Sequence, residues 1–90
     1  MIIARRLRVT GRVQGVFFRA WTRNEARTLS VSGWVRNCSD GSVEAQLEGE
    51  PATIQALIEL MRDGPPGAQV ENVEIEDADR EGLSGFEIRR

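Results

Sequence analysis

Hydrophobic and polar residues alternate in several short stretches of the chain, which is the pattern of half-buried β-strands. The clearest stretch is residues 42–48, where Val43, Ala45 and Leu47 alternate with glutamate and glutamine. This period of two places the hydrophobic side chains on one face of a sheet and the polar side chains on the other. Similar stretches predict further strands at residues 4–10, 33–38, 70–76 and 86–88.

Two other stretches have the period of a helix. Residues 51–63 begin with Pro51, which suits a first turn, and end before Gly64, which suits a C-terminal cap. Their hydrophobic residues recur at i, i+3, i+4 and i+7, namely Ile54, Leu57, Ile58 and Met61. A shorter helix is predicted at residues 20–29, with Thr22, Ala26 and Leu29 toward the core.

The order of these elements is β-α-β-β-α-β with one further strand at the end. This order predicts an α+β fold, a ferredoxin-like βαββαβ sandwich in which two helices cover one face of an antiparallel sheet. The last strand is expected to be a short C-terminal edge strand. Residues 1–90 are expected to form a single domain, because this length suffices for one core only. Many functions share this fold, so the fold alone does not name one.

The net charge of −2 hides an uneven distribution of charge. Residues 1–45 carry eight arginines against three acidic residues, giving +5, whereas residues 46–90 carry four arginines against eleven acidic residues, giving −7. The positive half favours a small anion as ligand, while the negative half argues against a long polyanion such as nucleic acid. No stretch approaches the roughly 20 apolar residues of a membrane helix, so neither nucleic acid nor membrane is an expected partner.

Cys38 is the single cysteine of the chain, so no internal disulfide can form. This is compatible with a reducing compartment and leads us to expect a cytoplasmic protein. One cysteine also excludes the Cys-x-x-Cys pair of redox and metal-carrying proteins. The acidic residues 76–79 lack a recognisable spacing of metal ligands and are interpreted as a solvated turn. We therefore expect no metal and no cofactor.

Candidate chemistry concentrates between the first predicted strand and the first predicted helix. Gly11 and Gly15 allow the backbone to curl tightly and to point successive N–H groups at one spot. The helix adds its free N-terminal N–H groups, and Arg19 offers a planar fork of donors at the closing edge. These features predict a phosphate-binding loop, although an ordinary turn with a solvated arginine is the alternative. Asn37, just before a Ser-Asp-Gly turn, either bonds its own backbone or takes part in this site.

Two long motifs resemble those of the acylphosphatase family. One is Val-Thr-Gly-Arg-Val-Gln-Gly-Val-Phe-Phe-Arg at residues 9–19, and the other is Gly-Trp-Val-Arg-Asn-Cys-Ser-Asp-Gly-Ser-Val at residues 33–43. The resemblance covers nearly all of the chain and implies that Asn37 positions an attacking water. It also implies that Arg19 holds a phosphate together with the backbone amides of the preceding loop, namely Gln14, Gly15, Val16, Phe17 and Phe18.

The implied activity is hydrolysis of the carboxyl–phosphate bond of a small-molecule acyl phosphate, without a metal. The leaving carboxylate has a conjugate acid of pKa about 4, so it departs without a general acid. This agrees with a chain that has no histidine. Inorganic phosphate or sulfate is expected to occupy the loop, and the protein is expected to be a monomer. The general base stays open; an oxygen of the substrate phosphate is one candidate.

Two departures from the family pattern concern packing. Ser30 stands where the family often has glycine, so the first helix lacks a glycine cap. Arg89 and Arg90 end the chain where an aromatic residue is common, which leaves the terminal packing open. A rival function is a non-catalytic phosphate-binding or interaction domain, similar to the domains at the front of hydrogenase-maturation carbamoyltransferases.

Overall fold

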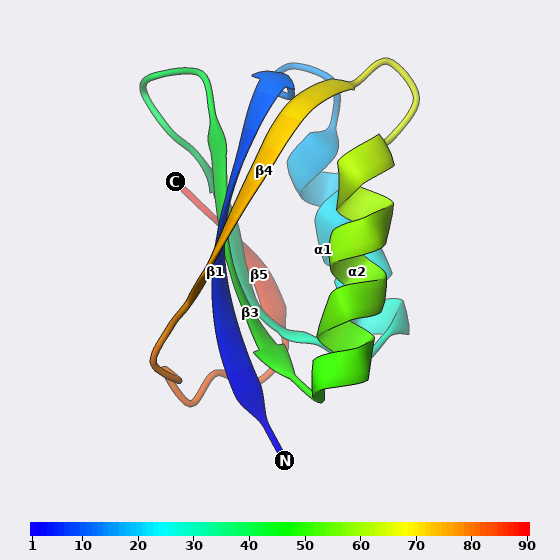
Figure 1. The fold of residues 1–90 in the computed structure, drawn as a ribbon. Coiled ribbons are helices and arrows are strands. Elements are labelled where there is room, and N and C mark those ends of the chain that lie inside the picture. Colours follow the sequence, from blue (N-terminus) through cyan, green and yellow to red (C-terminus); the bar gives the residue numbers. More distant parts are fainter.

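A five-stranded sheet with two helices on one of its faces makes up the computed structural model, which describes all of residues 1–90 (Figure 1). Each predicted strand and helix is present, although several begin or end one or two residues from the predicted position. Neither helix is long and apolar enough to cross a membrane. In chain order the elements are β1 (Ile3–Arg12), α1 (Phe18–Thr28), β2 (Ser32–Asn37), β3 (Val43–Gly49), α2 (Pro51–Asp63), β4 (Gln69–Asp77) and β5 (Phe86–Arg89).

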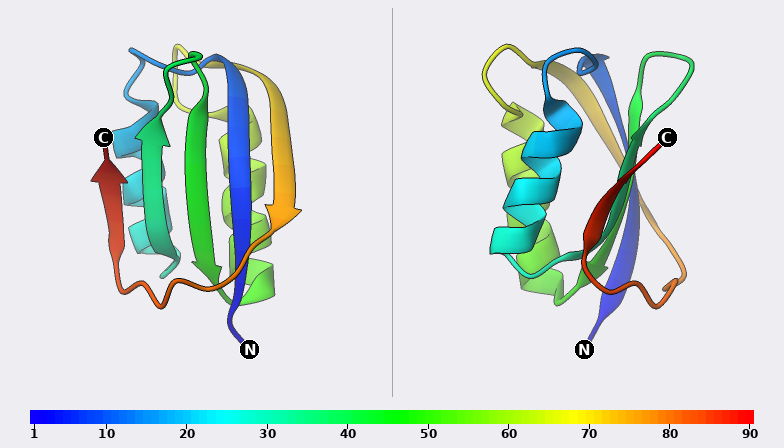
Figure 2. Two further views of the ribbon diagram at one scale, coloured as in Figure 1. Left: turned by 90° about the vertical axis from the view of Figure 1, so that its left-hand side faces the viewer. Right: turned by 180° about the vertical axis from the view of Figure 1, so that it is seen from behind.

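The strands lie in the order β4-β1-β3-β2-β5. The pairs β4–β1, β1–β3 and β3–β2 are antiparallel. β5 is the predicted C-terminal edge strand, and it runs parallel to β2, so the sheet is mixed at this edge. The reason lies in residues 78–85, called here the crossover segment. This segment passes from one edge of the sheet to the other at the end where β2 begins (Figure 2), so β5 enters beside β2 in the same direction.

β3 lies between β1 and β2 and is antiparallel to both. β1 and β2 are therefore parallel to each other and finish at the same end of the sheet (Figure 2). The register makes this arrangement specific, because Val43 of β3 pairs with Val9 of β1 on one side and with Asn37 of β2 on the other. The loop after β1 and the turn after β2 consequently lie close together.

The hydrophobic core fills the space between the sheet and the two helices. The stripe predicted for α2 is buried in full, and Gly64 ends this helix with φ 71°, as a C-terminal cap requires. α1 begins at Phe18, not at residue 20 as predicted, and Phe18 joins Thr22 and Ala26 in facing the core. Trp21 packs at the edge of this helix, with its ring centroid 5.7 Å from that of Phe18.

α1 ends in a Schellman motif that has serine in place of glycine. The N–H of Val31 donates to the carbonyl of Ala26 at 2.8 Å, and the N–H of Ser30 donates to that of Arg27 at 3.2 Å. Ser30 adopts the left-handed φ of 57° that this motif needs. The missing glycine thus leaves the cap intact and adds backbone strain at Ser30.

The crossover segment covers part of the sheet face away from the helices. Gln46 and Glu48 of β3 face this side and are only 0% and 3% exposed. The Glu48 carboxylate accepts hydrogen bonds from the backbone N–H groups of Glu81 at 2.7 Å and Leu83 at 3.3 Å. The side-chain amide of Gln46 donates to the carbonyl of Asp79 at 3.0 Å. The acidic residues Glu76, Asp77 and Asp79 are exposed, as the solvated-turn interpretation predicts, although Glu76 and Asp77 belong to the end of β4.

The side chain of Trp34 in β2 lies on the same face of the sheet and contacts the crossover segment. Its indole N–H donates to the carboxylate of Glu81 at 3.1 Å, and its side chain is almost fully buried. Three guanidinium groups lie against its ring, those of Arg6 at 4.9 Å, Arg36 at 5.6 Å and Arg89 at 5.1 Å from the centroid. Arg89, the residue before the last, thus packs against Trp34 near the end of the chain, where the family pattern has an aromatic residue.

Burial alone would raise the pKa of Glu48. Hydrogen bonds from the side chain of Gln46 and from the backbone N–H groups of Glu81, Leu83 and Gly82 outweigh this effect and hold the pKa below its ordinary value of 4.5. A carboxyl group whose pKa is lowered by folding stabilises the native state above its unfolded-state pKa. This contribution is lost as the pH falls through the lower, native-state pKa.

We therefore expect Glu48→Gln to lower the free energy of unfolding at pH 7 by about 1–3 kcal/mol. The side-chain amide of glutamine would place an N–H donor against the N–H groups that now donate to the carboxylate of Glu48. The difference from the unchanged protein should shrink as the pH falls below about 4.5. Urea denaturation between pH 7 and pH 3 measures it. The exposed Glu71→Gln is the control and should match the unchanged protein throughout. A Glu48→Gln deficit that stays constant with pH would contradict this role.

Candidate functional site

Residues 13–17 form the loop between β1 and α1, called here the β1–α1 loop. Two of its residues have left-handed backbone conformations, Gly15 with φ 76° and Phe17 with φ 63°. No backbone N–H group of residues 13–17 donates a hydrogen bond to another protein group. No side chain caps α1, whose first backbone bond runs from the N–H of Trp21 to the carbonyl of Phe17 at 3.0 Å. The loop and the first turn of the helix together hold a series of free donors.

Arg19 stands in the first turn of α1, half-buried, next to these free N–H groups. Its guanidinium makes no ion pair or hydrogen bond with any protein group, whereas Arg5, Arg6 and Arg8 of β1 are all paired with carboxylates. A cation at the positive end of a helix dipole is unfavourable unless an anion is bound there. The surroundings of Arg19 therefore favour an anionic ligand.

Asn37 is the last residue of β2 and lies on the helix side of the sheet, in the same row as the buried Val43. Its side-chain oxygen Oδ1 is buried and has no hydrogen-bond partner. The alternative that Asn37 bonds its own turn is not what the structure shows. Asp40 fills that role instead, because its Oδ1 accepts from the N–H of Ser42 at 3.0 Å and from its Oγ at 2.6 Å.

Residues 38–42 connect β2 to β3 and are called here the β2–β3 turn. The same two bonds favour the charged form of Asp40 in this turn. Hydrogen bonds from the side chain and the backbone N–H of Ser42 lower the pKa of Asp40, and the nearby Arg8, at 2.8 Å, acts in the same direction. Asp40 therefore stays ionised to a lower pH than an isolated aspartate does. A charged aspartate that is held in this way keeps the turn in one conformation and so supports Asn37, which immediately precedes the turn.

Arg19 and Asn37 line one cavity of about 420 Å³, although they come from different elements. Of the predicted loop residues, Gly15, Phe17 and Phe18 also line it, whereas Gln14 and Val16 do not. Sequence reasoning missed the remaining lining residues, which are hydrophobic: Val13, Ala20 and Ile88. Ile88 belongs to β5 at the edge of the sheet, and no local signal in its short strand ties it to the β1–α1 loop.

The family resemblance implies a role only for the backbone amide of Gln14. In the structure the side chain of Gln14 also makes contacts. Its side-chain Nε2 donates to the carbonyl of Cys38 at 2.8 Å and to that of Ser42 at 2.9 Å. These two carbonyls flank the β2–β3 turn, so the Gln14 side chain ties the β1–α1 loop to the strand end that carries Asn37. Cys38 is half-buried, and its thiol does not line the cavity.

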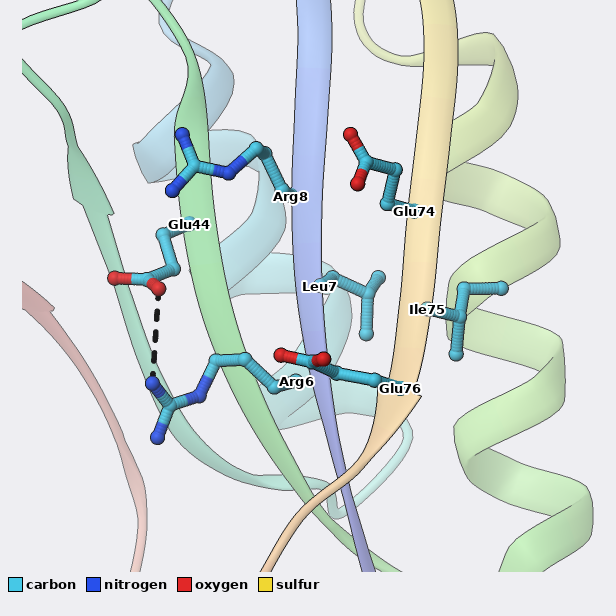
Figure 3. Close-up of a pocket in the computed structure, with 7 residues that line it drawn as sticks. All are labelled: Arg6, Leu7, Arg8, Glu44, Glu74, Ile75 and Glu76. Atoms are coloured by element: carbon cyan, nitrogen blue, oxygen red, sulfur yellow. Dashed lines mark ion pairs between the residues drawn. The ribbon is translucent and has the colours of Figure 1, made fainter.

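A second, smaller hollow of about 150 Å³ lies on the opposite face of the sheet (Figure 3). It contains none of the predicted site residues. One ion pair joins two of its lining residues, Arg6 and Glu44 at 3.6 Å, while Arg8 pairs at 2.8 Å with Asp40 outside the hollow. Three acidic side chains border it, but no group of histidine, cysteine, aspartate or glutamate side chains in the protein is arranged to hold a metal ion.

The arrangement of the larger cavity suits the binding of a small tetrahedral anion. Gly15, Phe17 and Phe18, whose backbone N–H groups have no protein acceptor, line the cavity together with Arg19, and Asn37, whose buried Oδ1 has no partner, lines it as well. The lining contains no carboxylate, imidazole or thiol. A reaction in this cavity must therefore proceed without proton transfer from an acidic side chain of the lining.

Comparison with known proteins gives one consistent family. A family model described as Acylphosphatase matches residues 5–88. The chain is 51% identical over 81 residues to a protein of Haloarcula marismortui named acylphosphatase, which covers 90% of this chain and 89% of that one. It is also similar to a crystal structure of acylphosphatase from Bacillus subtilis, with a TM-score of 0.95, 35% identity and full coverage of both chains.

A part of a larger protein matches as well. The crystal structure of full-length HypF in the phosphate- and nucleotide-bound form aligns with a TM-score of 0.89 and 26% identity. The match covers all of this chain but only 12% of that one. The same fold thus occurs both in proteins of this size and as one region of a much longer chain.

The Gln14 contacts lead to a prediction about stability. We expect Gln14→Ala to lower the free energy of unfolding by about 1–2 kcal/mol, because the carbonyls of Cys38 and Ser42 lose a shared donor. Chemical denaturation measures this change. The control is Gln55→Ala on the exposed face of α2, where alanine suits the helix and the stability should change little. Equal stability of the two variants would show that Gln14 does not tie the loop to the turn.

Proposed function

The chain belongs to the acylphosphatase family, whose members hydrolyse acyl phosphates, and we propose that it performs this reaction in the cavity between Arg19 and Asn37. The family membership confirms the resemblance of the two sequence motifs. One observation carries the assignment of the site: an unpaired guanidinium and an unpartnered amide oxygen line the same cavity.

In this proposal the phosphate group of the substrate lies against the β1–α1 loop. Its oxygens accept hydrogen bonds from the backbone N–H groups of residues 14–18 and from the guanidinium of Arg19. These donors have no acceptor within the protein, so the substrate replaces water and not a protein partner. The transition state of phosphoryl transfer carries its charge on the peripheral oxygens, where fixed donors stabilise it most.

Asn37 is proposed to hold the attacking water. Its buried Oδ1 accepts a hydrogen bond from the water and so fixes the oxygen lone pair toward phosphorus, in line with the leaving group. The bond between the water oxygen and phosphorus forms while the bond between phosphorus and the acyl oxygen breaks. The electron pair of that second bond leaves with the carboxylate.

The lining offers no group to take the proton of the water. We assign this role to an oxygen of the substrate phosphate, which becomes part of the inorganic phosphate product. The carboxylate needs no protonation, because its conjugate acid has a pKa of about 4. A phosphomonoester would instead release a strongly basic alkoxide, and we expect little activity on such substrates.

The proposal also covers the oligomeric state of the protein, its location in the cell and its need for a cofactor. We propose a monomer that acts in the cytoplasm without a metal or other cofactor. The single Cys38 has no second cysteine to pair with, which suits a reducing compartment.

The function is tested by hydrolysis of benzoyl phosphate in the presence of EDTA. We expect turnover by the unchanged protein and a loss of about 10²–10³-fold in kcat/KM for Arg19→Ala and for Asn37→Ala. Arg19→Ala should also weaken inhibition by inorganic phosphate, whereas Asn37→Ala should act mainly on kcat. Arg23→Ala, four residues further along the same helix, is the matched control and should retain activity.

Two results would contradict the proposal. A near-normal kcat of Asn37→Ala would exclude its role in holding the water. Absence of turnover by folded protein that still binds phosphate would favour the rival function, a binding domain like the region matched in HypF.

A further inference from the structure

The proposed site is larger and more hydrophobic than phosphate binding requires. A water molecule takes up about 30 Å³ in the liquid, and a phosphate group is only a few times this size. The cavity of about 420 Å³ leaves most of its space for the rest of the substrate. Most of the lining is hydrophobic, and two of these residues, Phe17 and Ile88, come from the loop and from β5. Such a lining suits an apolar ligand group.

Phe17 has no structural role that explains its side chain. The ring is 84% exposed and so contributes almost nothing to the core, unlike Phe18 beside it, which is buried. Its backbone has φ 63° and ψ 26°, a left-handed conformation that is unfavourable for an aromatic residue. An exposed aromatic residue with an unfavourable backbone conformation therefore borders the proposed phosphate site, as residues with such conformations often do at ligand sites.

Ile88 offers a second hydrophobic surface to the same cavity. It is half-buried on β5, which the crossover segment delivers to the edge of β2. Phe17 and Ile88 are far apart in the sequence but line the same cavity. The acyl part of a bound acyl phosphate must extend into this space, because its phosphate end is held by Arg19 and the loop.

We propose that Phe17 and Ile88 form a subsite for the acyl group, which makes the protein selective for acyl phosphates with an aromatic or extended apolar acyl group. An aromatic acyl group packs against the Phe17 ring in an offset or edge-to-face arrangement. An acetyl or carbamoyl group is too small to reach both surfaces. This inference rests on the proposed function and names the class of substrate for the same site.

The test compares kcat/KM for benzoyl phosphate with kcat/KM for acetyl phosphate. The two substrates share the phosphate end, so any effect of a variant on phosphate binding cancels in their ratio. We expect Phe17→Asn, which tolerates a left-handed backbone, to lower the benzoyl-to-acetyl ratio about tenfold. Phe17→Tyr keeps the ring and should keep the ratio. Ile88→Ala should lower the ratio in the same direction as Phe17→Asn.

The matched control is Ile75→Ala on β4, which removes a partly exposed isoleucine outside the cavity and should leave the ratio unchanged. An unchanged ratio in Phe17→Asn, with both substrates turned over, would overturn the acyl subsite and leave the proposed function intact. Absence of turnover of either substrate by the unchanged protein would overturn both.

Discussion

The pairing of β3 with both of its neighbours is the constraint on which the site depends. Because β1 and β2 are each antiparallel to β3, they run in the same direction and end together (Figure 2). Val43 aligns Val9 with Asn37, so the β1–α1 loop emerges beside the amide that is proposed to hold water. The side chain of Gln14 then links the loop to the turn after β2. Sheet register thus places the two halves of the proposed site.

The proposed site consists of groups that folding leaves without partners. The N–H groups of the β1–α1 loop, the guanidinium of Arg19 and the Oδ1 of Asn37 all lack a protein partner. A buried polar group without a partner costs about 1–3 kcal/mol, so the rest of the fold must supply the stability. Outside the site the buried carboxylate of Glu48 is well satisfied, whereas the buried hydroxyl of Thr22 also lacks a partner. By holding the crossover segment, Glu48 also brings β5, and with it Ile88, to the cavity.

Much of this could be predicted from the sequence. The helical period of α2 and the alternation in β3 gave the correct core faces, and the two motifs selected Arg19 and Asn37, which share one cavity. The start of α1 was misplaced because a phenylalanine gives no signal for the left-handed turn that Phe17 makes. The burial of Glu48 and the direction of β5 both depend on contacts with the crossover segment, which are distant in the sequence. Local patterns cannot reveal such contacts.

A crystal structure with bound inorganic phosphate tests the central claim most directly, since the claim concerns which atoms surround the anion. The proposed mechanism predicts phosphate oxygens within hydrogen-bonding distance of the Arg19 guanidinium and of the N–H groups of residues 14–18, with the amide of Asn37 facing the phosphorus from the opposite wall of the cavity. Phosphate bound elsewhere, or bound in the cavity without contact to Arg19 and the loop, would contradict it.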